Sequence, residues 1–483
     1  MSRSVVVHGH FYQPPRENPW TGVVDPEPTA APFHDWNQRI ETESYGPVGS
    51  ARVLDRDGNV AHRDNLYASM SFDVGPTLFE WMEPNAPLTY ARILEADKLS
   101  VARLGYGNAI AMPYHHTILP LASRRDKVTE LLWGISDFRR RFAREPEGMW
   151  LPETAVDEET LEVLAEIGIQ FTILAPHQVE TTSEDGLPLR FRAAKGREVA
   201  LCIYDQQLSG GIAFGRLIAD GALLANRLAP TEPSDHTIVT AAAVDGETFG
   251  HHHHFGEMAL ARAFRILAEQ DDVRIENFAS FLARNPPVTD AVLVSPSSWS
   301  CTHGIERWRS NCGCRLRPEE GTSQAWRASL RDGIEWLAGE LHKIFEREGK
   351  ELFTVDPWHV RDAYAEIGPS EAEALAFVAG SIARRNDGAR MERGAELLAM
   401  EEAALSMFTS CAWFFDDISR IETIQVLKYA AFAIELSGDA TRLESGLLER
   451  IGDVKSNDPT EGTGRDIWRR KVKSAHPELA APQ

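Results

Sequence analysis

The stretch that decides the fold is Thr237-Ile238-Val239-Thr240-Ala241-Ala242-Ala243-Val244-Asp245-Gly246-Glu247. Its first eight residues form a near-continuous apolar run, which is typical of a parallel strand covered on both faces. The run leads directly into Asp245 and Glu247. Two carboxyl groups after a buried strand are costly unless they have partners or a chemical task. We therefore predict a buried strand whose carboxyl end opens into a polar site.

Similar short runs recur through the first 300 residues, at 4–7, 170–174, 199–204 and 291–294. Helical patterns separate them. One begins at residues 157–159 and places Leu161, Leu164 and Ile167 on one face. This alternation predicts an α/β domain with a parallel sheet, either open or closed into a barrel.

Polar residues follow the ends of these strands, and in parallel α/β folds such positions line the ligand site. The set comprises His8, His10, Asp205, Asp245, Glu247 and Trp299. Two histidines at alternate positions point the same way from a strand. They could bind sugar hydroxyls, ligate a metal or serve as satisfied structural residues.

After about residue 320 the pattern becomes helical, with predicted helices at 326–344, 371–378, 394–408 and 421–436. We predict three regions: a catalytic domain over 1–300, a helical domain over 301–455 and a loosely ordered tail over 456–483. Residues 14–68 are polar and rich in Pro and Gly, and they form a long insertion after the first strand. Insertions of this length are usually functional or mobile.

The charge balance excludes several classes of partner. The 483 residues contain 50 Lys and Arg against 72 Asp and Glu, a formal net charge of −22. So acidic a surface repels nucleic acid and anionic membranes but does not exclude a neutral substrate such as a sugar. No apolar run approaches the ~18–20 residues of a membrane span. The start of the chain lacks the apolar core of a secretory signal, and five cysteines do not make a disulfide framework. These features predict a cytoplasmic enzyme.

A second carboxylate candidate lies in Gly148-Met149-Trp150-Leu151-Pro152-Glu153. Pro152 stiffens the turn, Trp150 offers a flat ring of the kind that stacks on sugars, and Glu153 is held beside it. The alternative is a glutamate that only stabilises a helix N-terminus. Glu153 and Asp245 at one mouth suit glycosidic bond chemistry, in which one carboxylate attacks the anomeric carbon and the other protonates the leaving oxygen. The charge of Glu247 would help to raise the pKa of the acid.

Four motifs in order along the first 300 residues resemble those of glycoside hydrolase family 57. They are His8-Gly9-His10 with Gln13-Pro14; Tyr114-His115-His116-Thr117-Ile118-Leu119-Pro120-Leu121; the segment 148–153; and Asp245-Gly246-Glu247-Thr248-Phe249-Gly250-His251. The resemblance implies an incomplete (β/α)7 barrel followed by a helical domain that closes over the cleft. It also implies a retaining mechanism on α-glucans that requires no cofactor.

The resemblance further implies roles for individual residues. Glu153 stands at the catalytic nucleophile and Asp245 at the general acid/base. The predicted substrate-binding set is His8, His10, Gln13, His116, Trp150, Glu247, His251, Trp299, Trp413 and Asp416. Residues 66–78 are similar to the second strand region of the family, and we interpret them as scaffold.

The chain departs from the family pattern in two places. The fifth motif usually has an acid directly before a tryptophan, whereas Ala412 precedes Trp413 here and Asp416 and Asp417 follow it. The segment 298–314 is absent from the well-studied amylases and branching enzymes. It resembles a less characterised subgroup with its own helical extension.

Cys301, His303, Cys312 and Cys314 give a C-x-H-x8-C-x-C pattern within fourteen residues. Four soft ligands are the number and type that a structural zinc ion requires. Packed thiols and a redox or disulfide role are the alternatives.

Two other functions remain open at this point. A metal-dependent polysaccharide deacetylase would use His8 and His10 as metal ligands. A non-catalytic glucan-binding protein on the same scaffold would bind an α-glucan or oligosaccharide without turnover.

Overall fold

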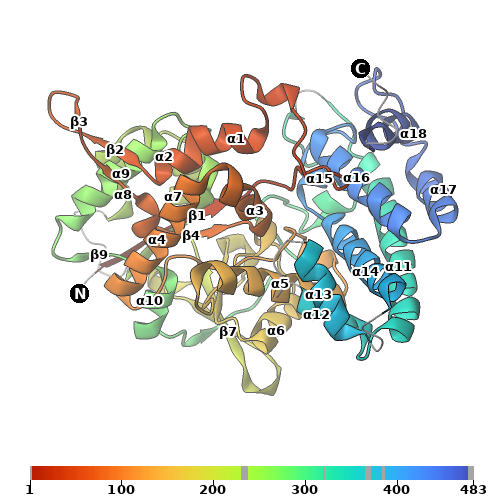
Figure 1. Cartoon of the computed structure of the whole chain (residues 1–483). Helices are drawn as coiled ribbons and strands as arrows, with labels where there is room; N and C mark the ends of the chain where they lie inside the picture. The colour runs from red at the N-terminus through yellow and green to blue at the C-terminus, as the bar shows by residue number, and fades with distance from the viewer. Residues whose placement is uncertain (1–2, 230–237, 319–320, 365–370, 383–386, 477–483) are drawn as a thin grey trace. The chain divides into compact units, whose positions relative to one another are not determined.

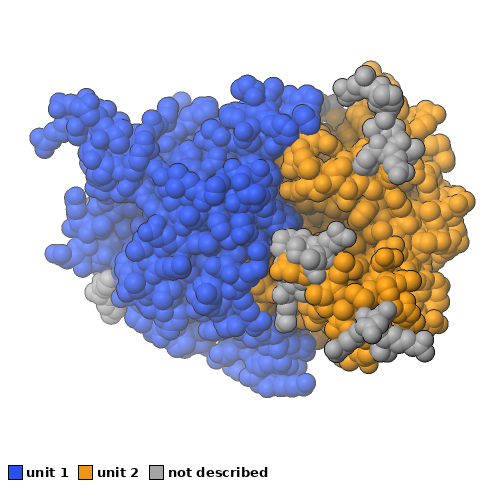
Figure 2. Space-filling view, in the orientation of Figure 1, with its two compact units in different colours: residues 1–13, 26–113, 138–299 blue, residues 14–25, 114–137, 300–483 orange. Residues whose placement is uncertain are grey.

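The structure is a computed structural model of the whole chain, and it describes residues 3–229, 238–318, 321–364, 371–382 and 387–476 (Figure 1). The chain forms two compact units (Figure 2). Unit 1 comprises Met1–Gln13, Pro26–Pro113 and Phe138–Trp299, and unit 2 comprises Pro14–Asp25, Tyr114–Asp137 and Ser300–Gln483. Two short segments, 14–25 and 114–137, therefore belong to unit 2, and from residue 300 onward the whole chain belongs to it.

Strand β1 (Arg3–Phe11) forms the centre of unit 1. It pairs in parallel with β4 (Ser71–Val74), with β8 (Val239–Asp245) and, at its start, with β9 (Val273–Ile275). All residues of β1 after Arg3 are buried, as expected for a parallel strand with both faces covered. Residue 237, where we predicted β8 to begin, lies outside the described residues.

The parallel arrangement continues beyond β4. Parallel bridges lead from β4 to residues 109–111, then to 148–150, then to β5 (Phe171–Leu174), which pairs with β7 (Glu198–Ile203). With β1, β4 and β8 these make seven parallel segments.

The arrangement is open at one seam. Between β7 and β8 the described residues form no ladder, although the Asp205 N–H donates to the Ala241 carbonyl at 2.8 Å. The predicted incomplete (β/α)7 barrel is therefore confirmed.

Helices follow the strands of unit 1. They are α3 (Pro76–Asn85), α4 (Pro87–Leu104), α5 (Arg124–Phe142), α6 (Glu158–Ile167), α7 (Gln206–Ala213), α8 (Gly221–Leu228), α9 (Gly256–Ala268) and α10 (Phe278–Arg284). Helix α5 begins in unit 2 and ends in unit 1. Helix α6 begins where the sequence predicts, because the Asp157 side chain accepts a hydrogen bond from the Thr160 N–H.

The predicted strand at 291–294 is wrong. Strand β10 is only Thr289–Asp290, and it pairs with β6 (Leu189–Arg192), which in turn pairs antiparallel with β7. Val292 is 54% exposed and Val294 37% exposed. The apolar run therefore lies largely at the surface. It makes an isolated bridge between Leu293 and Val179, and the Ala291 N–H donates to the Arg190 carbonyl at 2.8 Å, but it forms no strand.

The insertion at 14–68 has its own secondary structure. It contains η1 (Pro28–Ala30), α1 (Trp36–Ile40), η2 (Glu41–Tyr45), α2 (Gly46–Val48), the hairpin β2 (Ala51–Leu54) with β3 (Val60–Asp64), and η3 (Leu66–Ala68). Tyr45 and Val48 are fully buried. This part of the insertion therefore contributes to the core of unit 1.

Unit 2 is helical. Its helices after residue 320 are α11 (Trp326–Leu352), α12 (Pro357–Tyr364), α13 (Glu371–Ser381), α14 (Gly388–Ser406), α15 (Cys411–Phe414), α16 (Ile421–Leu436), α17 (Ala440–Ile451) and α18 (Gly464–Ile467). The predicted apolar face of α11 is buried, with Leu330, Ile334, Leu337, Leu341 and Ile344 in the core. No described helix has the length and apolar character that a membrane crossing requires.

The region from residue 456 differs from the loose tail that we predicted. Helix α18 begins with a capping box between Thr463 and Asp466, and η13 (Trp468–Val472) continues it. Ile467, Trp468 and Val472 are buried, and the Trp468 Nε1–H donates to Glu444 at 2.8 Å. Core packing therefore holds this segment. Residues 477–483 lie outside the described part of the chain.

Candidate active site

The strand register of unit 1 brings two predicted site strands, β1 and β8, together with β4 at one point. His10 of β1 pairs with Asp73 of β4 on one side and with Asp245 of β8 on the other. Side chains at paired positions of parallel strands project to the same face. The sheet therefore collects one histidine and two carboxylates at the carboxyl ends of its three adjacent strands.

Asp73 holds both histidines of the first motif. Its carboxylate contacts the His8 Nε2 at 3.0 Å and the His10 Nδ1 at 2.7 Å, and all three residues are buried. Burial alone would lower the pKa of His10, but Asp73, with Asp245 and Glu247, outweighs burial and raises it to about 9. Burial lowers the pKa of His8. His10 therefore carries a positive charge at neutral pH beside an ionised Asp73.

Asp245 is the carboxyl group that keeps its proton. Burial raises its pKa, and the charges of Glu247 and Glu153 raise it further against the opposing charge of His10, to about 7. A carboxylic acid with a pKa near neutrality can donate and recover a proton at physiological pH. The effect of Glu153 on Asp245 also places the two predicted catalytic carboxylates within electrostatic reach of one another.

Glu153 lies on a turn with an unusual backbone. It lies in η5 (Pro152–Thr154) with φ 58° and ψ 20°, in the left-handed region, and Thr154 follows with φ 49°. Such a conformation costs free energy in a residue other than glycine, so the surrounding structure must enforce it. Trp299 does so at two points: its Nε1–H donates to Glu153 Oε2 and its backbone N–H donates to the Glu153 carbonyl, both at 3.0 Å.

Trp150 differs from the expected open platform for a sugar ring. Its side chain is fully buried, and both imidazoles stack on it, His8 and His10 each with ring centroids 5.0 Å away. Trp299 meets it edge-on at 5.1 Å. In the structure Trp150 is therefore the support beneath the two histidines and beside Trp299.

Glu247 is bound by the chain's first motif and by the insertion. The Gln13 Nε2–H donates to its Oε1 at 3.1 Å, and the Tyr45 hydroxyl donates to the same oxygen. Burial, together with the charge of Glu247, raises the pKa of Tyr45 well above its ordinary value, which keeps the phenol protonated as a donor. His251 pairs with Glu43 of the insertion.

Sequence reasoning missed Asp73 and Tyr45. We interpreted residues 66–78 as scaffold, and Asp73 is an acid within a buried strand, which is the signal that could have identified it. Tyr45 lies in a polar insertion with no pattern that points to a site. Asp205, predicted to line the mouth, instead caps helix α7 by accepting from the Gln207 and Leu208 N–H groups.

Two further predicted residues belong to unit 2. His116 has a positive φ of 57°, and its Nδ1 contacts the Ser410 hydroxyl at 2.6 Å. Trp413 is fully buried, and its Nε1–H donates to the Arg327 carbonyl at 3.2 Å. Trp413 is therefore part of the packed core in this structure rather than an open ring.

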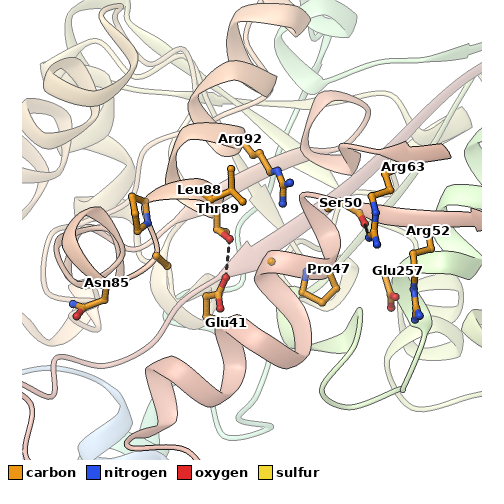
Figure 3. A pocket seen from close by; sticks show the side chains of 13 residues that line it. Glu41, Pro47, Ser50, Arg52, Arg63, Asn85, Leu88, Thr89, Arg92 and Glu257 are labelled. Carbon is orange, nitrogen blue, oxygen red and sulfur yellow. Dashed lines mark hydrogen bonds between the residues drawn. The ribbon is translucent and has the colours of Figure 1, made fainter. Parts of the chain in front are cut away.

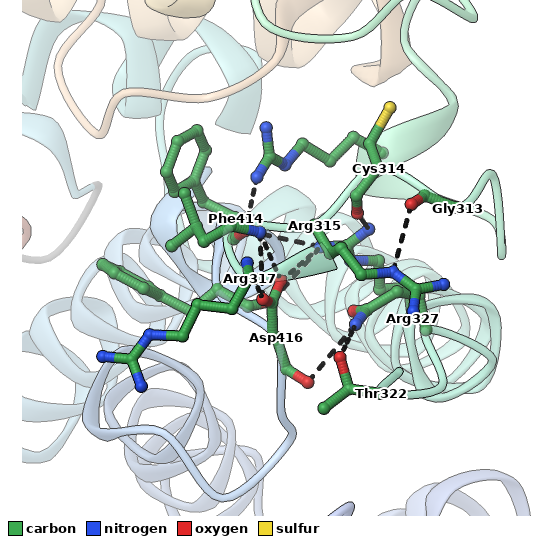
Figure 4. Close-up of polar contacts among 12 residues, drawn as sticks. Gly313, Cys314, Arg315, Arg317, Thr322, Arg327, Phe414 and Asp416 are labelled. Atoms are coloured by element: carbon green, nitrogen blue, oxygen red, sulfur yellow. Dashed lines mark hydrogen bonds and ion pairs between the residues drawn. The ribbon is translucent and has the colours of Figure 1, made fainter. Parts of the chain in front are cut away.

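Asp416 differs from its predicted role as a sugar ligand. Its carboxylate accepts hydrogen bonds from the Leu316 N–H at 2.9 Å and from the Arg317 N–H at 3.0 Å (Figure 4). Arg327 lies 3.9 Å away. The carboxylate therefore holds the loop that follows Cys314.

A cavity of about 660 Å³ in unit 1 is lined by a different set of residues (Figure 3). Arg52, Arg63 and Arg92 face it together with Glu41 and Glu257. Glu41 accepts a hydrogen bond from the Thr89 hydroxyl at 2.7 Å. None of the predicted catalytic or substrate-binding residues lines this cavity.

The Cys/His pattern in unit 2 is brought together by the fold. One ligand atom from each of Cys301, His303, Cys312 and Cys314 lies within 4.8 Å of the others. The five cysteines all lie among the described residues, and none of them forms a disulfide bond. Among the residues that the structure describes, these four form a group that could hold a metal ion.

Comparison with protein families identifies two regions. The model of glycosyl hydrolase family 57 matches residues 80–289, and a domain of unknown function, DUF3536, matches residues 323–481. Comparison with curated proteins finds no match.

Several solved structures share the fold. An exo-type maltose-forming amylase from Pyrococcus sp. ST04 aligns with a TM-score of 0.70 at 15% identity, over 92% of this chain and 82% of that one. A 4-α-glucanotransferase from Thermococcus litoralis aligns with a TM-score of 0.55 at 14% identity, over 90% of this chain and 59% of that one. A branching enzyme from Pyrococcus horikoshii aligns with a TM-score of 0.54 at 14% identity, over 93% of this chain and 94% of that one.

Proposed function

Because residues 80–289 match the model of glycosyl hydrolase family 57, we propose that the chain cleaves or transfers α-glucosidic linkages in α-glucans with retention of configuration. The family match and the fold of the amylase, the glucanotransferase and the branching enzyme support this activity. The observation that carries it is the pair of carboxyl groups in unit 1. Asp245 has a pKa of about 7, and the charge of Glu153 contributes to that value.

Glu153 is the nucleophile of this proposal. The turn at 152–154 and the Trp299 backbone N–H fix the backbone of Glu153, and the Trp299 Nε1–H fixes its carboxylate. Attack on the anomeric carbon forms a β-linked glycosyl-enzyme and releases the departing sugar oxygen. The rigid turn orients the attacking oxygen before the substrate binds, so less entropy is lost in reaching the transition state. Such orientation is a main source of rate enhancement.

Asp245 is the general acid and then the general base. In its protonated form it gives its proton to the departing oxygen. Once Asp245 is ionised, it accepts a proton from the water or sugar hydroxyl that attacks the glycosyl-enzyme. Its pKa near 7 suits both steps, because proton donors work best when their pKa lies close to the working pH.

Replacing Glu153 by Gln tests the nucleophile. We expect product formation from maltooligosaccharides, amylose and glycogen to fall at least about 10³-fold, because the amide has the same shape but cannot attack. Glu158→Gln is the matched control, since Glu158 is an exposed residue of the first turn of α6. Mass spectrometry of the products separates shortened chains, which indicate hydrolysis, from redistributed chains, which indicate transfer.

Azide rescue assigns the two roles separately. In Glu153→Ala the space left by the nucleophile admits azide, and we expect a β-glycosyl azide from an activated α-glucosyl substrate. In Asp245→Ala we expect the α-glycosyl azide. Azide then attacks the β-linked glycosyl-enzyme in place of water, and the two successive inversions retain the α configuration. The same anomer from both variants would contradict the assignment, and unchanged turnover in Glu153→Gln would exclude Glu153 as the nucleophile.

The deacetylase alternative is not favoured. Its mechanism needs His8 as a metal ligand through a ring nitrogen. In the structure the His8 Nδ1 contacts the Ser71 hydroxyl at 3.1 Å and the Nε2 contacts Asp73 at 3.0 Å, so both nitrogens are occupied within the fold. A non-catalytic glucan-binding protein is the outcome if the wild-type chain binds α-glucans without changing them.

A further inference from the structure

Four potential metal ligands converge in unit 2, and two of the distances between them match those of a tetrahedral metal site. The Sγ atoms of Cys301 and Cys314 lie 3.8 Å apart, and the Cys314 Sγ lies 3.5 Å from the His303 Nδ1. With Zn–S bonds of about 2.3 Å and Zn–N bonds of about 2.0–2.1 Å, a tetrahedron places two sulfurs about 3.8 Å apart and a sulfur and a nitrogen about 3.5 Å apart. We propose that Cys301, His303, Cys312 and Cys314 bind one zinc ion as a tetrahedral Cys3His site.

Hydrogen bonds fix the backbone around these ligands. The Arg327 Nη1–H donates to the Cys314 carbonyl at 2.7 Å, and Asp416 accepts from the Leu316 and Arg317 N–H groups directly after it. Figure 4 shows the Cys314 sulfur directed away from these backbone contacts. On the other side, the Gly304 N–H donates to the Cys301 carbonyl at 3.2 Å. The ligands are therefore held in place by contacts that do not involve their donor atoms.

The charges around the cluster favour an anionic site. Arg307 and Arg327 are both buried. They donate to carbonyls, at 3.0 Å from Arg307 to Ser300 and at 2.7 Å from Arg327 to Cys314. Among the described residues Arg307 pairs with no carboxylate, Arg327 has only Asp416 at 3.9 Å, and the Nε atom of each arginine has no hydrogen-bond partner.

A buried guanidinium group is costly when, among the described residues, it has no carboxylate partner, as at Arg307, or only one at 3.9 Å, as at Arg327. Three thiolates around one Zn²⁺ carry a net charge of −1, whereas three neutral thiols carry none. Zinc binding releases the thiol protons to solvent and leaves the anionic complex beside the two guanidinium groups. The buried arginines therefore support thiolate ligation independently of the ligand distances.

A zinc ion bound in this way would be structural rather than catalytic. Four protein ligands complete the coordination of zinc, so no position remains for a reacting water. The proposed zinc ligands include neither of the carboxylates proposed for glycosidic chemistry, and the test of the site does not depend on that activity. His303 is exposed and Cys312 and Cys314 are part-exposed, so zinc can reach the site in the folded chain.

Metal content of the full-length chain is the first test. The chain is purified under reducing conditions without a metal-affinity tag, incubated with excess zinc, passed through a desalting column and analysed by elemental mass spectrometry. We expect about one zinc per chain in the wild type. His303→Ala and Cys312→Ser should each lower zinc affinity by at least about 100-fold, because even indirect support of a metal ligand is worth about 10–100-fold.

Cys411→Ser is the matched control, since Cys411 is a cysteine of the same unit that lies outside the cluster. It should retain zinc as the wild type does. His303→Ala alters an exposed side chain, so its fold can be checked by circular dichroism without the loss of a buried group.

Cobalt substitution of the wild-type chain reports on the ligands directly. We expect saturation at one Co²⁺ per chain, with the intense visible bands of tetrahedral cobalt and strong thiolate charge-transfer bands. Weak octahedral bands would overturn the proposal, and so would a Cys301–Cys314 disulfide that persists after purification under reducing conditions. Equal zinc content in the wild type, His303→Ala and Cys312→Ser would also overturn it.

Discussion

Among single residues, the environment of Asp245 determines the pH dependence of the proposed reaction. Burial and the charge of Glu247 raise its pKa to about 7, and the charge of His10 opposes them. The free enzyme needs Asp245 protonated to begin catalysis. We expect kcat/KM to fall as the pH rises through about 7.

Glu247→Gln tests the electrostatic part of this pKa. The substitution removes the negative charge that favours protonation of Asp245, so its pKa should fall and the alkaline limb of the kcat/KM profile should move to lower pH. The pH–rate profile with a maltooligosaccharide checks this, with Glu158→Gln as the unaltered reference. An alkaline limb that stays in place or moves to higher pH would contradict the role of Glu247.

The raised pKa of Asp245 also makes the free energy of unfolding depend on pH. Asp245 ionises near pH 4 when unfolded and at about pH 7 in the folded chain. Between these values the folded state binds more protons, so the free energy of unfolding falls as the pH rises, and the loss is complete above about pH 7.

Asp245→Asn should therefore be inactive but more stable than the wild type at pH 8. We expect a gain on the order of 1–3 kcal/mol, because one pKa unit corresponds to about 1.4 kcal/mol. The gain should be smaller at pH 5, where the wild-type carboxyl is largely protonated in the folded chain. Thermal unfolding of both proteins at the two pH values measures it, and a variant destabilised equally at both would refute the argument.

Residue patterns alone could identify Glu153 and Asp245 as candidates, but not their surroundings. Asp73 holds His8 and His10, and Tyr45 contacts Glu247, yet neither residue stands near its partner in sequence. Strand pairing brings Asp73 to its histidines. Trp150 could not be predicted to be buried, because an aromatic residue at a strand end has the same sequence pattern whether its ring is open or covered.

At the level of secondary structure, the barrel includes two parallel segments that are too short to be recognised from the sequence. Residues 109–111 and 148–150 connect β4 to β5 through isolated bridges. Periodicity needs a longer run, so the sequence predicted β1, β5, β7 and β8 but not these segments. Their pairing comes from neighbours on both sides. The segment at 291–294 shows the converse, since its apolar residues alone do not make a strand.

Gly148→Ala tests the packing of one such segment. A Cβ atom at Gly148 would lie 2.3 Å from the ring of Phe171, which begins β5. Overpacking of this kind costs about 1–3 kcal/mol, and the displaced segment leads to Glu153. We therefore expect a lower Tm and lower activity.

Gly210→Ala is the control for that substitution. Gly210 lies in α7, and nothing lies within 4 Å of an added Cβ. Alanine in a helix is more favourable than glycine, so this variant should be about 0.5–1 kcal/mol more stable than the wild type. If Gly148→Ala proves as stable as Gly210→Ala, the packing argument at β5 is wrong.

In the whole molecule, the two units are interleaved along the chain. Residues 114–137 belong to unit 2 and supply groups to its core. Arg361 is fully buried, lies 2.8 Å from Glu401 and pairs with Asp126 at 2.9 Å. The Trp133 Nε1–H donates to the Arg361 carbonyl at 3.0 Å.

A fragment of residues 300–483 should therefore fail to fold by itself. It lacks Asp126 and Trp133, and breaking a buried ion pair costs about 3–5 kcal/mol, which approaches the stability of a whole domain. Thermal unfolding followed by circular dichroism should show a cooperative transition for the full chain and none for the fragment. A cooperative transition in the fragment would show that unit 2 does not need residues 114–137.

Local sequence patterns were enough to predict the class of the fold and the candidate acids and histidines at its centre. Apolar runs that end in acids and histidines need only local spacing to be recognised, and so do the long apolar face of α11 and the ligand pattern after Trp299. The tertiary structure alone decided which partners those residues have. It paired Asp73 with His8 and His10 and buried Trp150. It also bound the Asp416 carboxylate to backbone N–H groups and assigned residues 114–137 to unit 2. The physical reason is that local patterns depend on neighbours a few residues away, whereas strand register and burial depend on contacts between distant segments that exist only in the folded chain.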